Sequence, residues 1–181
     1  VNGSPIESEN PTHLTLAELN TDGSVLWAKN IGIGFILEDP LVVPCVADRI
    51  NSSPLLRGIK TWTDGSIYIY GGTNVSVDGR SPSGRADAFV SKFDSQGNKL
   101  WTQLLGDASN EGTQSLGFAS DGSIYVEYAS DGQEQGIFVS KISSSGSLLW
   151  SQRIGDSLAD AQTSAFSLDG NSLFTIGPVS Y

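Results

Sequence analysis

Few residues in this sequence could carry acid–base or nucleophilic chemistry. The single histidine, His13, lies in a polar stretch shortly after Pro11. A Ser-His-Asp arrangement needs a histidine held beside its nucleophile, and histidine-ligated metal clusters need several such side chains. Glycosidase-like carboxylate pairs could come from Asp64, Asp121 and Asp169, but each precedes a glycine, where turn formation accounts for it. The sequence therefore predicts a non-enzymatic protein with no catalytic residues and no cofactor.

A calcium-binding loop is a second chemical hypothesis. Asp107, Ser109 and Glu111 alternate along the chain as oxygen ligands of Ca²⁺ can. The corresponding stretch of the next repeat, with Asp156 and Asp160, does not reproduce the spacing. We therefore expect a solvated loop between repeats and no metal site.

Trp62 is the candidate residue for binding a ligand. Ala119 and Ser167 stand at its position in the other repeats, so the repeat itself does not explain this aromatic side chain. Tryptophan offers a flat apolar face on which a sugar could stack. The alternative is that Trp62 covers neighbouring parts of the protein.

The elements that must position these residues repeat along the chain. Trp27, Trp101 and Trp150 each lie in the string G-x-x-L-W-x-x-x-I/L-G, which follows an apolar alternating run. An apolar run, a polar turn closed by glycine and a second apolar run predict a β-hairpin. We expect the tryptophans to pack between neighbouring units, the glycines to supply positive φ, and Asp22, Asp94 and Ser144 to hydrogen-bond the turn backbone.

A different hairpin alternates with the tryptophan hairpins. Residues 59–72, 116–129 and 164–177 each place Asp-Gly between an apolar run and an alternating run, a strong hairpin signal. The period is close to fifty residues, since Trp101 and Trp150 are 49 apart. Two hairpins per period give four strands, the content of one β-propeller blade. We predict an all-β fold of propeller-type four-stranded blades, about three in this chain, with a β-trefoil or β-prism as the alternative.

The domain organisation follows from where this pattern begins and breaks. Residues 1–13 are predicted to be a polar lead-in, and residues 14–181 a single domain with an insertion at 33–57. Three prolines exclude a long helix in the insertion, which is either a recognition surface or a packed structural element. Residues 73–87 are polar and rich in Gly and Ser, so we expect a solvated connection there.

The two ends of the pattern are complementary. The first tryptophan hairpin lacks an Asp-Gly partner, and the last Asp-Gly hairpin lacks a tryptophan partner, so each is half a blade. The missing halves could come from further blades of a longer chain, from a second copy in a closed ring, or from successive copies in an open filament. We therefore expect other copies of the chain, or further blades, as partners.

Composition excludes several function classes. The net charge of −10 and the scattered Lys and Arg argue against nucleic-acid binding. No apolar run approaches the length of a membrane span. The lone cysteine, Cys45, excludes an internal disulfide and lies in an apolar run where an inert buried thiol is expected.

Three strings carry a family resemblance: DAFVSKFDSQGNKLW at 87–101, IFVSKISSSGSLLW at 137–150 and SDGSIYV at 120–126. They resemble the bacterial seven-bladed β-propeller repeat. The resemblance covers residues 58–178 and, in part, 14–32, where Glu18 stands in place of the family's lysine. It implies a propeller in a secreted or surface-exposed bacterial protein, without defined catalytic residues.

Together these observations predict an extracellular or cell-surface structural or adhesive module that assembles through its terminal half-blades or belongs to a larger propeller. The alternative is a carbohydrate- or protein-binding module that uses the 33–57 insertion and the polar loops, with a glycan as its ligand.

Overall fold

The described part of the chain is entirely β-structure. The computed structural model describes residues 12–35, 56–133, 135–155, 165–168 and 173–176. Within these ranges it forms twelve strands and no helix, which confirms the all-β prediction; no helix there could cross a membrane. The strands are β1 (Thr12–Leu19), β2 (Val25–Phe35), β3 (Leu56–Thr61), β4 (Ile67–Thr73), β5 (Asp87–Phe93), β6 (Lys99–Leu105), β7 (Glu111–Phe118), β8 (Ile124–Ser130), β9 (Gly136–Ile142), β10 (Leu148–Gly155), β11 (Ala165–Leu168) and β12 (Leu173–Ile176).

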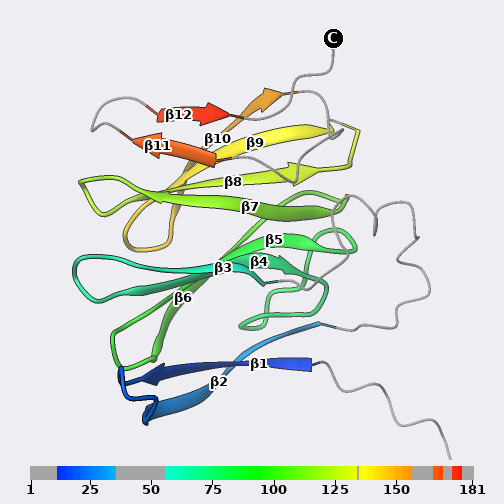
Figure 1. Cartoon of the computed structure of the whole chain (residues 1–181). Coiled ribbons are helices and arrows are strands. Elements are labelled where there is room, and N and C mark those ends of the chain that lie inside the picture. Colours follow the sequence, from blue (N-terminus) through cyan, green and yellow to red (C-terminus); the bar gives the residue numbers. More distant parts are fainter. Residues whose placement is uncertain (1–11, 36–55, 134, 156–164, 169–172, 177–181) are drawn as a thin grey trace, which may run out of the picture.

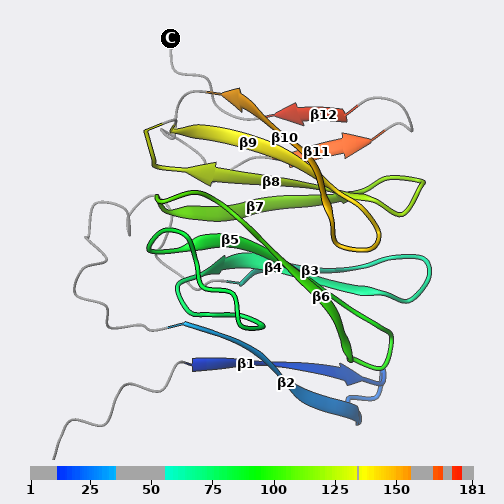
Figure 2. The same ribbon diagram turned by 180° about the vertical axis from the view of Figure 1, so that it is seen from behind.

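The strands form four antiparallel sheets that stack face to face in chain order (Figure 1 and, from behind, Figure 2). Two sheets have four strands, in the orders β3-β4-β5-β6 and β7-β8-β9-β10. Each consists of an Asp-Gly hairpin followed by a tryptophan hairpin, so each is one propeller-type blade. The other two sheets have two strands, β1-β2 and β11-β12, and correspond to one hairpin of each kind.

The turns of the tryptophan hairpins are built as the sequence predicts, with one correction. Gly97 and Gly146 have φ of 72° and 90°, and Asp94 accepts hydrogen bonds from the backbone N–H groups of Gln96 and Asn98. In the next hairpin the side chain that caps the turn is Ser143, whose hydroxyl accepts the Ser147 N–H at 3.0 Å. The prediction of Ser144 for this role is wrong by one residue, because Ser143 is the residue that follows the strand as Asp94 does.

Apolar side chains fill the spaces between sheets, so the central strands of the four-stranded sheets are buried on both faces. β5 is buried along its whole length, as expected for a strand covered by sheets on both sides. One core cluster lies between the two four-stranded blades and comprises Tyr68, Tyr70, Ala88, Val90, Leu105, Leu116, Ile124, Val126, Tyr128 and Ile142. A second lies between β1-β2 and the first blade and comprises Leu16, Ile31, Ile33, Ile69, Val77, Phe89 and Phe93.

The connection between β4 and β5 is exposed at most positions, as predicted for a solvated loop, but one side chain in it is buried. Val77 is 1% exposed and belongs to the second core cluster. A turn after it, closed by backbone hydrogen bonds between Val77 and Arg80, places Asp78 at a φ of 53°. An apolar side chain in the middle of a polar stretch thus fixes the loop on the body of the protein.

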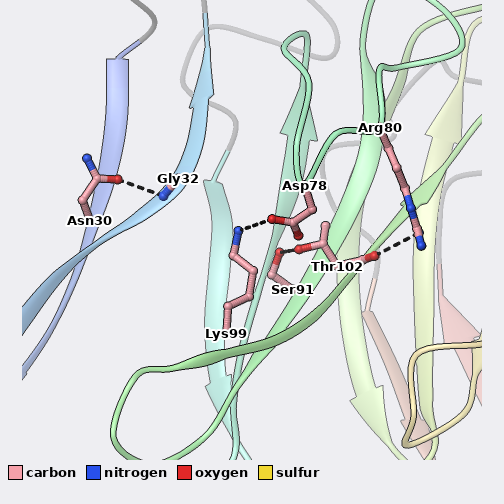
Figure 3. A network of polar contacts seen from close by, with 7 residues as sticks. All are labelled: Asn30, Gly32, Asp78, Arg80, Ser91, Lys99 and Thr102. Atoms are coloured by element: carbon pink, nitrogen blue, oxygen red, sulfur yellow. Dashed lines mark hydrogen bonds and ion pairs between the residues drawn. The ribbon is translucent and has the colours of Figure 1, made fainter.

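Polar contacts hold the same loop against β6 (Figure 3). Lys99 Nζ pairs with Asp78 Oδ1 at 2.9 Å, and Arg80 donates to the carbonyl of Thr102 at 3.3 Å. The hydroxyls of Ser91 and Thr102 share a 2.7 Å hydrogen bond between β5 and β6. The β5-β6 hairpin is therefore held to the loop by an ion pair and a hydrogen bond as well as by packing.

Several sequence predictions fall outside the described residues. These are most of the lead-in, the body of the insertion at 36–55 with Cys45, and the positions of Asp156, Asp160 and Asp169.

Candidate functional site

The recurring feature of the fold is a contact between a tryptophan and the turn glycine of the following tryptophan hairpin. Trp27 of β2 lies over Gly97, where an added Cβ would stand 2.6 Å from the indole ring. Trp101 of β6 lies over Gly146 at 2.7 Å, with the five-membered part of its ring nearest the glycine, whereas Trp27 presents the six-membered part. Only a residue without Cβ allows so close an approach. The predicted packing of tryptophans between neighbouring units is therefore found for both of these residues.

Within a blade, an aromatic ring and a lysine hold the tryptophan in place. Lys92 is opposite Trp101 in the β5-β6 pairing, and its Nζ lies 5.3 Å from the ring of Tyr68. Tyr68 in turn meets Trp101 edge-on at 6.0 Å. Such contacts between aromatic rings and a cation each contribute about 0.5–1 kcal/mol. The second blade repeats the arrangement with Tyr125, Lys141 and Trp150, at 5.4 Å and 5.8 Å.

The first hairpin uses a different solution. Glu18 is opposite Trp27, the place that lysine takes in the blades, and accepts a 2.6 Å hydrogen bond from the indole N–H. The cation comes from Lys29, whose Nζ lies 5.8 Å from the Trp27 ring and donates to Asn98 of the next hairpin at 2.7 Å. The replacement of lysine by Glu18 therefore keeps the tryptophan fixed.

At the two ends of the series of described tryptophan hairpins, one tryptophan and one turn glycine lack the contact made between neighbouring hairpins. Trp150 is 42% exposed, on a strand whose side chains are exposed along most of its length. Gly23 has a φ of 87°, and a Cβ built there would meet nothing within 4 Å. One end of the stack thus presents a tryptophan and the other a turn glycine.

Among the described strands, the β1-β2 hairpin also lacks a neighbour along the β1 edge. Leu19 is 55% exposed, whereas Phe93 and Ile142, which end the matching strands β5 and β9, are 1% and 0% exposed. In the blades, β4 and β8 lie beside those strands. Among the described strands, β1 has β2 as its one hydrogen-bonded neighbour. The exposed leucine marks the place where a second neighbour would lie.

Trp62, the predicted ligand-binding residue, is half-buried and takes part in the contact between blades. Its ring lies 4.6 Å from that of Phe118 in the next blade, tilted by 35°. Phe118 in turn meets Tyr68 edge-on at 5.1 Å. One face of the Trp62 ring is therefore already in contact with protein.

The three residues with calcium-like spacing do not share one environment. Asp107 is exposed and accepts the Ser109 N–H at 2.8 Å. Glu111 begins β7 and is 2% exposed, so the expectation of a solvated loop is wrong at this position. Its Oε1 accepts the hydroxyl of Ser130 at 2.8 Å, while Oε2 is buried with no hydrogen-bond partner. Within the described ranges, no three His, Cys, Asp or Glu side chains are arranged to hold a metal ion.

The buried carboxyls are electrostatically unusual. Burial, together with the charges of Asp107 and Asp87, raises the pKa of Glu111 to about 8. Burial also raises the pKa of Asp87, against hydrogen bonds from the backbone of Ser83 and Gly84 that lower it. With a pKa of about 8, the Glu111 carboxyl is mostly protonated at pH 7.

Sequence reasoning does not single out Tyr68 or Lys92, and it names Glu111 only for its calcium-like spacing and not for its burial. A signal exists for the first two, because Tyr125 and Lys141 repeat them in the next blade. For Glu111 there is none, since its burial depends on how two sheets stack.

The sequence matches no known family model. Over 77 residues it is 35% identical to the regulatory protein FlaEY of Caulobacter vibrioides. That stretch covers 39% of this chain and 8% of FlaEY, so the chain corresponds to a small part of that relative.

Proposed function

We propose that this chain is a non-enzymatic structural or adhesive module that acts by joining propeller-type blades through its two half-blades. The half-blades are β1-β2, which matches the tryptophan hairpin of a blade, and β11-β12, which matches the Asp-Gly hairpin. Placed side by side, the two would complete one four-stranded sheet.

The observation that carries this proposal is the exposure of Leu19. Its counterparts in the complete blades are buried, so the β1-β2 hairpin has an apolar side that suits a neighbouring strand. Strand addition to such an edge combines main-chain hydrogen bonds with burial of alternate side chains. The neighbour would be the Asp-Gly hairpin of a second copy or of another blade in a longer protein.

We place this module outside the cell or on its surface. The acidic composition and the resemblance to secreted bacterial propeller repeats support this assignment. Fractionation of the native host, with detection of the chain in the medium or on intact cells, tests it. Recovery only from the cell interior would argue against it.

Light scattering over a range of concentrations, with negative-stain imaging, tests the joining function. The expected result is a mass of two or more copies at tens of micromolar, falling to one copy when residues 161–181 are deleted. A glycan array is the companion measurement. A chain that stays monomeric and gives a glycan signal lost in Trp62→Ala would instead support a carbohydrate-binding module.

A further inference from the structure

We infer that a second copy of this chain docks head to tail, with Trp150 of one copy packed on the turn glycine Gly23 of the other. This inference rests on the proposed joining function and names its partner and its central contact. The first ground is repetition, because a tryptophan packs on the turn glycine of the next tryptophan hairpin twice inside the chain, Trp27 on Gly97 and Trp101 on Gly146. Trp150 and Gly23 are the unmatched halves of that series.

The turn at Gly23 has the geometry that the contact requires. In all three tryptophan hairpins the glycine N–H donates to the carbonyl of the residue three positions earlier, at 2.9–3.0 Å. All three glycines have positive φ, between 72° and 90°. Gly23 therefore presents the same backbone surface as Gly97 and Gly146, and no described residue covers it.

Trp150 is held in position by contacts within its own blade. Tyr125 and Lys141 fix it just as Tyr68 and Lys92 fix Trp101. At the junction between the two four-stranded blades the Trp101 indole N–H also donates to the carbonyl of Ser144, two residues before the glycine, at 3.2 Å, whereas the Trp27 N–H donates to Glu18 of its own hairpin. Thr21 stands two residues before Gly23, so its carbonyl is the expected acceptor for Trp150.

A single docked arrangement would cover both the exposed edge of β1 and the exposed Trp150. In the second blade, the β9-β10 hairpin pairs with β8 while its turn lies under Trp101 of the preceding blade. If β1-β2 of a second copy pairs with β12, its turn lies under Trp150 by the same arrangement. Leu19 would then be covered as Ile142 is covered by β8. Because the two surfaces differ, the contact is heterologous, and the joined pair keeps one unused half of each kind unless a ring closes.

Two variants with one matched control test the contact by sedimentation velocity. Gly23→Ala adds a Cβ that would clash with Trp150 of the partner, and Trp150→Ala removes the ring. Gly79→Ala is the control, because Gly79 has a φ of 76° and open space above it, like Gly23, but lies outside the proposed contact. Loss of a central aromatic anchor commonly weakens association about 30-fold or more. We expect that loss in the two variants and none in Gly79→Ala.

Mixing the two variants distinguishes head-to-tail docking from other modes. Each variant alone should be monomeric, but an equimolar mixture should form a one-to-one dimer, through intact Gly23 of one variant and intact Trp150 of the other. Association that neither substitution weakens would overturn this contact while leaving the joining function standing. A mixture that stays monomeric would also overturn the head-to-tail contact. A wild-type chain that is monomeric at every concentration would show that a second copy is not the partner. The joining function would then have to act on blades of a longer protein.

Discussion

The carboxyl group of Glu111 lies where two blades meet, beside the acidic residues Asp87 and Asp107. Its pKa in the folded protein is about 8, against an ordinary value of 4.5. A raised acid pKa means that folding takes up a proton, so this contribution to stability is complete below pH 4.5 and is lost as the pH rises to about 8. Asp87, whose pKa is also raised, acts in the same direction.

Replacing Glu111 by glutamine tests this directly. The variant keeps the shape of the protonated acid but cannot ionise, so the free energy of unfolding should match wild type near pH 5 and exceed it at pH 8. The difference at pH 8 should be on the order of 4 kcal/mol at most, measured by urea denaturation. An equal loss of stability at both pH values would contradict the assignment of a proton to Glu111.

The tryptophan hairpin is the element on which the blades are joined, and its turn glycine can be tested against another turn in the same blade. Gly146 and Gly122 both have positive φ, so alanine at either should cost about 1–2 kcal/mol of backbone strain. At Gly122 the new Cβ would lie 3.6 Å from Ser144, an ordinary contact, whereas at Gly146 it would lie 2.7 Å from Trp101. Gly146→Ala should therefore lose about 1–3 kcal/mol more than Gly122→Ala in urea denaturation. Equal losses would mean that Trp101 moves aside at little cost.

The strands and hairpins were accessible from the sequence because their signals are local. Alternating apolar residues and turn glycines follow from strand geometry alone, and three copies fix the register. The errors occur where burial comes from another sheet. Val77 in a polar loop and Glu111 at the start of a strand are buried by parts of the chain that no local pattern identifies. Trp62 stands out in the sequence as an exception to the repeat, but its contact with Phe118 follows only from which blades are neighbours.

At the scale of the whole molecule, charge should oppose the joining of copies. Each chain carries a formal net charge of −10, and two such acidic chains repel each other over a Debye length of about 30 Å at 0.01 M salt but about 8 Å at 0.15 M. The dissociation constant of the assembly should therefore fall several-fold between these salt concentrations, measured by sedimentation velocity. Trp150→Ala is the control and should remain monomeric at both. Association that weakens with added salt would instead indicate attractive charge pairs at the junction.

Every sheet in the described part of the chain pairs strands that follow each other in sequence. Such contacts close only short loops, and chains dominated by them fold quickly because little entropy is lost before each contact forms. The order of stability along the stack should then follow the number of covered faces. Amide hydrogens of β5 and β8, which lie inside four-stranded blades, should exchange slowest, and those of the half-blade β1-β2 should exchange faster until a neighbouring blade covers it.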